Sequence, residues 1–436
     1  MSEKQSINEN IYTLVTDASG EERSCANIPD EACEDVPKGF VHNALSGVFS
    51  KLAEQLASPG LILPWLLSAA GASSFFSGAL VPIKDAGSLL PQLAVSGKIR
   101  TLQKRKIPWV LAAIVQGLAL LCMAWAVSKT EGNLLGWLVV ITLAIFSLAS
   151  GVASVAYKDV LGKTIPKGKR GQLLAVRSTA GGVLTTIGGY ILYKYIDETD
   201  DMSIYLTLIA SSALLWFVSA GLFYAIPEVK GATEGGRTPL KEFKQGWLLL
   251  KKNKNLQRFV IARALLMAIP FSQPFIILYG KEHVGSSIDN LGIMVVAAGV
   301  AGIISSPFWG RFADISSRKL MIFVGIMGFL ILLLAVFFPA LPNQWQHKYT
   351  YALIILLQVM AHGGARMSRK TYLVDMAPSH ERPLYVALSN TLIGLATLLF
   401  VVLGLIADVF SVDVMLWTLA ITSLLSALVS LRLKEV

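Results

Sequence analysis

Long apolar stretches dominate the chain between about residues 44 and 431. Twelve of them are long enough to cross a bilayer as helices, because ~20 apolar residues span its hydrocarbon core. The runs are continuous, whereas the strands of a membrane β-barrel alternate apolar and polar residues over ~10 positions. We therefore predict an all-α polytopic membrane protein with twelve transmembrane helices. The expected spans are 44–68, 72–96, 107–128, 134–157, 171–194, 203–226, 257–280, 288–309, 319–341, 349–368, 384–407 and 412–431.

Composition supports this prediction. The chain has 436 residues, of which 54% are hydrophobic and 15% are charged, against about 25% charged residues in soluble domains. The net charge of +10 would suit nucleic acid if it formed one surface, but the bases are spread over short loops, so we expect no nucleic-acid partner. Cys25, Cys33 and Cys122 lack metal-ligand spacing. We expect unpaired thiols and no bound metal.

Lysine and arginine in the loops predict the orientation, because cytoplasmic loops are enriched in both residues. If the N-terminus is inside, 23 of them fall in inside loops and four in outside loops. Both termini are therefore expected in the cytoplasm. The short loops and the absence of N-x-S/T sites suggest a bacterial inner membrane.

The chain divides into four regions. Residues 1–42 hold nine acids and three bases, a composition typical of disorder, without the pattern of a signal peptide. Six-helix bundles are expected over 43–226 and 257–436. The central loop, 227–256, contains apolar residues at helical spacing and many lysines, which predicts an amphipathic helix on the cytoplasmic membrane surface.

The two predicted bundles repeat one another. The sequence GKIRTLQKRK at 97–106 matches GRFADISSRK at 310–319, and KDVLGKTIPKGKR at 158–170 matches KTYLVDMAPSHER at 370–382. Two anchors in the same order, with offsets of 213 and 212 residues, indicate an internal duplication.

This arrangement resembles the major facilitator superfamily. The family motif G-x-x-x-D-x-x-x-R-K follows the second helix of a bundle and is present at 310–319, and the resemblance covers about 43–432. It implies two bundles around a central cavity, alternating access and a monomer. The first copy has Thr101 in place of the acid. The glycines of the fifth helix lack the proline typical of drug antiporters, so the subfamily stays unidentified.

The loop motif is a candidate gate. An acid at a helix end can face the positive N-terminus of a neighbouring helix, which would let Asp314 hold one conformation. The alternative is that the loop only determines topology. The candidate gating residues are Gly97, Arg105, Lys106, Gly310, Asp314, Arg318 and Lys319.

Ionisable residues inside the membrane are the strongest functional candidates, because a charge in lipid is costly unless it faces a cavity or a partner. Lys51 and Glu54 lie three residues apart on a polar face of the first helix, close enough to pair. Lys84 and Asp85 lie near the middle of the second helix. We expect Glu54 and Asp85 to carry protons, and Lys51 and Lys84 to contact an anionic group of the substrate. Mutual neutralisation in two internal salt bridges is the alternative.

Three further groups are candidates for the cavity wall. Arg177 and Arg263 lie about two turns into the fifth and seventh helices, and His362 shares a face of the tenth with Gln358 and Arg366. The alternatives are that the arginines extend to the membrane surface and that the histidine is satisfied between helices.

We therefore predict a secondary transporter that moves a small anionic or zwitterionic solute, coupled to protons. The sequence contains no nucleotide-binding loop, H-E-x-x-H motif or nucleophile elbow, so we expect neither a cofactor nor an enzyme activity. Two alternatives stay open, a lipid or hydrophobic-compound flippase on the same scaffold and a non-transporting receptor or scaffold that uses the acidic tail.

Overall fold

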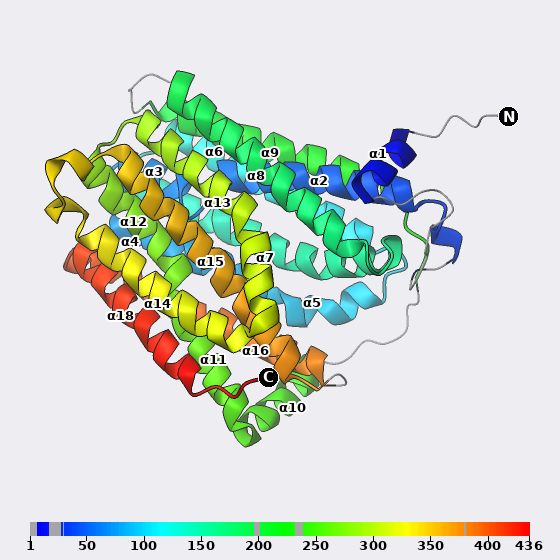
Figure 1. Cartoon of the computed structure of the whole chain (residues 1–436). Helices are drawn as coiled ribbons and strands as arrows, with labels where there is room; N and C mark the ends of the chain where they lie inside the picture. Colours follow the sequence, from blue (N-terminus) through cyan, green and yellow to red (C-terminus); the bar gives the residue numbers. More distant parts are fainter. Residues whose placement is uncertain (1–6, 17–27, 29, 196–200, 232–238, 379–380) are drawn as a thin grey trace.

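The computed structural model describes residues 7–16, 28, 30–195, 201–231, 239–378 and 381–436. Every regular element in these ranges is helical (Figure 1). Helix α1 (Ile7–Thr16) and the C-terminus lie on the same side of the bundle, which we call the termini side; the opposite side is the far side.

The first half contains six membrane-crossing rods. Their helices are α2 (Val36–Leu56) with α3 (Ile62–Ala69), α4 (Ser74–Leu89) with α5 (Pro91–Arg100), α6 (Lys106–Lys129), α7 (Gly132–Thr164), α8 (Arg170–Tyr195) and α9 (Met202–Tyr224). Pro59 and Gly60 separate the two helices of the first rod, and Pro91 begins α5. Proline breaks a helix in this way because it lacks an N–H group.

The second half repeats this plan. Its rods are α11 (Lys254–Leu266) with α12 (Ala268–Val284), α13 (Ile288–Ile315), α14 (Ser317–Val336), α15 (Lys348–Met376), α16 (Arg382–Leu399) with α17 (Leu403–Val409), and α18 (Val412–Leu431). Short 3₁₀ turns occupy Phe338–Ala340, Asn343–Trp345 and Phe400–Val402. Within the described residues, eight helical segments are long and apolar enough to cross a membrane. The predicted all-α fold with twelve rods is confirmed.

Some helices extend further than the apolar runs predicted. The sequence placed Lys370 in a loop and Gly97 and Gly310 at turns. In the structure, Lys370 lies in α15, Gly97 in α5 and Gly310 in α13. Helices at a membrane boundary continue into polar sequence, since their backbone hydrogen bonds do not depend on apolar side chains.

The N-terminal region also differs from the expectation of disorder. Residues Ile7–Thr16 form α1, which packs on α2. The ring of Tyr12 meets that of Phe40 edge to face at 5.3 Å, and the Lys169 ammonium donates to the carbonyl of Thr16 at 2.8 Å. Contacts of α1 with the rest of the bundle therefore stabilise a helix in a region whose acidic composition predicts disorder.

The cysteines differ from the prediction as well. Cys122 is free, but Cys33 forms a disulfide rather than remaining a thiol. Cys25 lies outside the described residues.

A glycine seam joins the two halves along α8 and α13. A Cβ atom on Gly189 would lie 2.6 Å from the backbone N of Val296, and one on Gly299 would lie 2.8 Å from the backbone N of Thr186. Such distances exclude any side chain. Glycine is required here because the two backbones touch.

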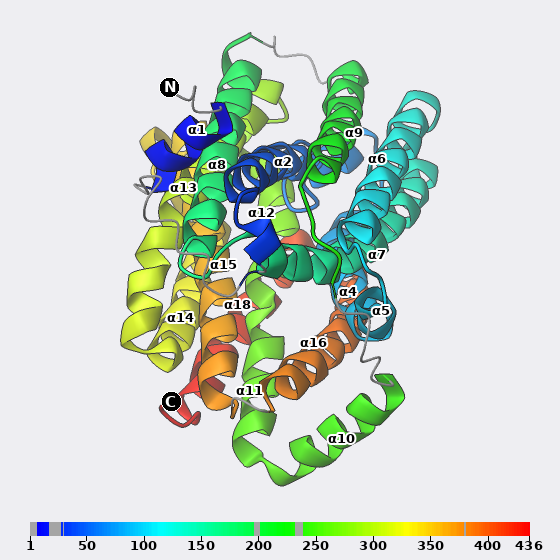
Figure 2. The same cartoon turned by 90° about the vertical axis from the view of Figure 1, so that its right-hand side faces the viewer.

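The halves also meet along α4, which packs against α12, α16 and α17. Figure 2, seen from the termini side, shows the first-half helices towards the top and right and the second-half helices towards the left and bottom, with α10 (Pro239–Lys252) lowest. The predicted basic helix of the central loop is thus present as α10, and it contacts α5 and α16.

Candidate functional site

A cavity of about 450 Å³ lies between the halves. Its walls come from α2, α4 and α8 on one side and from α12, α13 and α15 on the other. The lining reaches Leu174, one turn into α8, and Lys370, near the end of α15. Both residues lie towards the termini side, so the cavity extends in that direction.

The far end of the cavity is closed by the two broken rods. Gly60, in the break between α2 and α3, lies against the side chain of Gln273 from α12. Further out, a Cβ on Gly78 of α4 would lie 2.7 Å from the Cα of Gly404 in α17. Discontinuous helices thus meet where the halves touch, as is usual at transporter binding sites.

One wall of the cavity holds the charged residues of α2 and α4. The Lys51 ammonium and the Glu54 carboxylate form an ion pair at 3.3 Å, with side chains 42% and 30% exposed, so the predicted pairing is present. Lys84 and Asp85 also line the cavity, and they form no ion pair with each other within the described residues.

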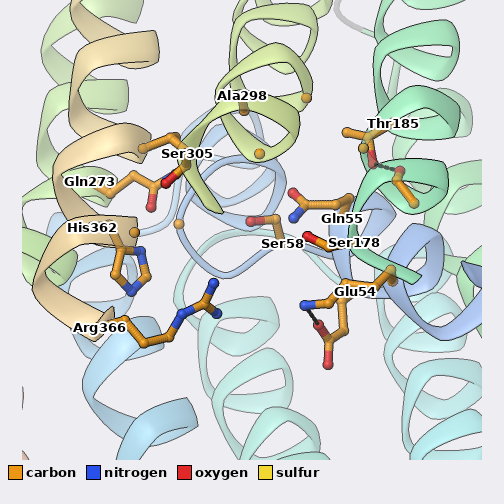
Figure 3. A pocket seen from close by; sticks show the side chains of 18 of the residues that line it. Glu54, Gln55, Ser58, Ser178, Thr185, Gln273, Ala298, Ser305, His362 and Arg366 are labelled. Carbon is orange, nitrogen blue, oxygen red and sulfur yellow. Dashed lines mark hydrogen bonds and ion pairs between the residues drawn. The ribbon is translucent and has the colours of Figure 1, made fainter. Parts of the chain in front are cut away.

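The facing wall holds a basic ladder on α15, which we define as His362, Arg366 and Lys370 at successive turns. Figure 3 shows the first two of these side chains. Arg366 acts electrostatically on Lys51 and Glu54 from this facing wall, and Lys84 acts on them from their own wall. Gln358 points elsewhere and donates to the hydroxyl of Ser272 at 2.7 Å.

Sequence reasoning missed several lining residues. Arg366 was noted only as a neighbour of His362, and Lys370 was assigned to a loop. Gln55, Ser178 and Gln273 are neutral, and they give no signal until the helices are placed. The four-residue spacing of 362, 366 and 370 was the one available indication of the ladder.

The structure places Arg177 and Arg263 behind the cavity wall rather than on it. The Arg177 guanidinium donates to the Asn43 amide oxygen at 2.5 Å and lies 4.5 Å from the ring centroid of Tyr157. Arg263 is buried and donates to the Ser389 hydroxyl at 2.6 Å and the Asn390 amide oxygen at 2.9 Å. Both are held between helices by neutral partners, so neither extends to the membrane surface.

In the first half, an acid from outside the loop motif holds the loop. The Glu228 carboxylate, which follows α9, accepts the backbone N–H groups of Arg105 at 2.9 Å and Lys106 at 2.8 Å. It also pairs with the Lys163 ammonium at 3.0 Å, and its side chain is fully buried. Arg105 itself pairs with Asp159 at 3.3 Å. Glu228 therefore caps the N-terminus of α6, where negative charge is favoured.

The second half has a related arrangement after its last helix. The Arg318 guanidinium pairs with the Glu435 carboxylate at 3.0 Å, and the Ser316 hydroxyl, which also contacts Glu435, accepts the backbone N–H of Lys319 at 3.1 Å. Asp314 is exposed and makes no hydrogen bond or ion pair within the described residues. Its proposed gating role therefore stays a prediction.

Two polar contacts join the halves on the far side. The Asp408 carboxylate from α17 accepts the backbone N–H of Phe75 at 3.1 Å and contacts the hydroxyl of Ser73, the N-cap residue of α4. We call this contact the Asp408 latch. In the second contact, the hydroxyls of Tyr193 and Tyr349 lie 2.8 Å apart.

Comparisons with known proteins agree with this geometry. A model of the Major Facilitator Superfamily matches residues 271–436. The uncharacterized protein Rv2209 of Mycobacterium tuberculosis is 25% identical over 373 residues, 83% of this chain and 70% of the relative. The uncharacterized MFS-type transporter YqjV of Bacillus subtilis is 27% identical over 139 residues, 32% of each chain.

Solved structures extend the likeness to nearly the whole chain. The xylose transporter XylE from E. coli, in a partially occluded inward-open conformation, aligns with a TM-score of 0.66 and 16% identity over 92% of this chain and 98% of its own. A mutant of the nucleoside transporter NupG aligns with a TM-score of 0.70 and 12% identity over 91% and 99%. The chain thus shares the fold of these membrane proteins. Its residues 271–436 in addition match the family model of the Major Facilitator Superfamily.

Proposed function

We propose that this protein is a secondary active transporter that moves a small anionic or zwitterionic solute by alternating access, coupled to protons. The observation that supports this most strongly is the charged cavity between the halves, which extends towards one side of the bundle and is closed on the other. The two halves would rock about the glycine seam and expose the cavity to each side in turn.

Glu54 and Asp85 are the proposed proton carriers. A carboxylate beside a lysine in a cavity can exchange its partner for a proton during the cycle. Protonation of Glu54 would release the Lys51 ammonium for the solute. Coupling requires that the solute and the proton bind the two facing states with different free energies.

The termini side is proposed to be cytoplasmic. It carries the basic residues that favour the cytoplasmic face, and α10, with four lysines among its 14 residues, lies there. The bacterial relatives are compatible with a bacterial inner membrane. The polar cavity favours a soluble substrate over a lipid or a hydrophobic compound. We propose neither a catalytic activity nor a receptor role.

Proton coupling can be tested in proteoliposomes that contain a pH-sensitive dye. A panel of carboxylates, phosphate esters, amino acids and sugars is added outside, and at least one should drive proton movement through the wild-type protein. Glu54→Gln should abolish this response without a loss of folded protein in a thermal unfolding assay. Glu131→Gln, a matched change of an exposed acid beside α7, should respond like wild type. An unchanged pH response in Glu54→Gln would remove Glu54 from the proposal.

A further inference from the structure

The charges that line the cavity do not balance. Four lining side chains are cationic, Lys51, Lys84, Arg366 and Lys370, and two are carboxylates, Glu54 and Asp85. With His362 neutral, the wall carries an excess of two positive charges. Unpaired charges in a low-dielectric site are unfavourable and call for a counter-charge.

Among the residues that the structure describes, those behind the wall do not supply that counter-charge. The Arg369 guanidinium lies 2.7 Å from the sulfur of Met267, and Arg263 binds only the neutral groups of Ser389 and Asn390. Asp85 is the carboxylate that acts on both arginines, and it is already counted in the wall. The surroundings therefore add to the positive excess rather than cancel it.

The excess of two lies on the wall of the second half, because Glu54 and Asp85 balance the two lysines of the first half. Arg366 and Lys370 belong to the basic ladder of α15 in the second half, while Lys51 and Lys84 belong to α2 and α4 in the first. Figure 3 shows His362 and Arg366 on one side and Glu54, Gln55 and Ser58 opposite. A solute with two anionic groups would neutralise the two cations of the basic ladder, and the planar guanidinium of Arg366 suits a carboxylate or phosphate group.

We propose that the cavity binds a small solute carrying two negative charges, either a dicarboxylate or a phosphate monoester. This inference rests on the proposed transport function and specifies its substrate class. By neutralising Arg366 and Lys370, such a solute would leave the cavity without a net charge. A volume of about 450 Å³ accommodates a molecule of this size together with water, since a water molecule occupies about 30 Å³.

Two series of probes that change charge at nearly constant size test the inference. The first is succinate, succinamate and succinamide, with charges of two, one and zero. The second is methyl phosphate and dimethyl phosphate at pH 8, where a phosphate monoester carries close to two charges. Binding to the purified full chain is measured by calorimetry and thermal unfolding at constant ionic strength, because salt screens such contacts.

A dianion should bind about ten- to a hundredfold more tightly than its singly charged counterpart, the range expected for one additional charged hydrogen bond. Binding of succinate alone would identify a dicarboxylate site, and binding of methyl phosphate alone a phosphate site. Equal binding of the singly charged probe, or no binding of either dianion, would overturn the inference. Solute-driven proton movement with a neutral or singly charged solute would still leave the transport function standing.

A variant that removes one positive charge tests whether Arg366 is responsible for the preference for the dianion. Arg366→Gln should reduce the preference for the dianion to about threefold or less, while the weak binding of the singly charged probe stays within about twofold. Arg366→Lys should recover part of the preference. Arg311→Gln removes an exposed arginine of α13 that does not line the cavity and should bind like wild type. A preference that survives in Arg366→Gln, or is lost equally in Arg311→Gln, would also overturn the inference.

Discussion

Replacing Asp408 by asparagine should open the far side of the protein. The Asp408 latch connects α17 of the second half to the N-terminus of α4 in the first. Asparagine has the same shape as aspartate, but it lacks the charge that the helix N-terminus favours. The change therefore weakens the contact between the halves without creating a void.

The size of the effect follows from the two interactions that the substitution weakens. An exposed charge at a helix terminus contributes about 0.3–1 kcal/mol, and a hydrogen bond to a charged group about 1.5–3 kcal/mol. Asp408 is exposed, and asparagine can still accept one bond, so we expect about 1–2 kcal/mol in total. A difference of that size changes the ratio of closed to open molecules by about 5- to 30-fold.

Cysteine labelling measures this ratio directly. Ser58→Cys places a thiol in the cavity with almost no change of volume, in a background whose native cysteines are replaced by serine. A membrane-impermeant maleimide added from the far side reaches this thiol only when that side opens. The labelling rate should rise about 5- to 30-fold when Asp408→Asn is combined with Ser58→Cys.

The control removes another acid from the same side. Asp413 lies in the first turn of α18, within the second half, and Asp413→Asn should leave the labelling rate unchanged. If Asp408→Asn also leaves the rate unchanged, the latch does not hold the far side closed. If both variants raise it equally, the effect belongs to surface charge rather than to the contact with α4.

Three further predictions concern stability. Glu228→Gln should lower the free energy of unfolding by about 3 kcal/mol, because it leaves the Lys163 ammonium without its buried partner. A change below about 1 kcal/mol in chemical unfolding would contradict a stabilising role of this ion pair. Gly189→Ala should reduce both thermal stability and solute-driven flux. In Gly188→Ala, where a Cβ meets nothing within 4 Å, both should be preserved, and the free energy of unfolding should rise by at most ~1 kcal/mol. Equal behaviour of the two variants would contradict a close backbone contact at the glycine seam. Tyr12→Ala should speed hydrogen exchange in α1 alone, and faster exchange throughout the bundle would show that α1 stabilises the whole fold.

Much of the fold could be predicted because the bilayer imposes a simple rule on the sequence. Each spanning segment must be long and apolar, so twelve runs predict twelve rods. The duplication at 97–106 and 310–319 indicated the two halves. The tail was less predictable, because contacts with distant residues, such as Phe40 and Lys169, stabilise a helix in a region whose composition indicates disorder.

The candidate site was only partly predictable. The sequence indicates how deep in the membrane a charged residue lies, but not in which direction its side chain points. Glu54 and Lys84 do face the cavity, as expected. Arg177 and Arg263 have the same chemical character, yet they point between helices towards Asn43 and Ser389. The direction of a side chain depends on the rotation of each helix about its axis, which packing between distant segments determines.

The two carboxylates at the ends of the halves, Glu228 and Glu435, bear on how the duplicated segments have diverged. In the first half, the acid of the loop motif is absent, and a residue more than 120 positions further along the chain binds the same loop. The negative charge at this loop therefore comes from a distant segment, while position 101 is a threonine. Each loop is thereby tied to the segment that follows the last helix of its own half, although the residues that form the tie differ between the two halves.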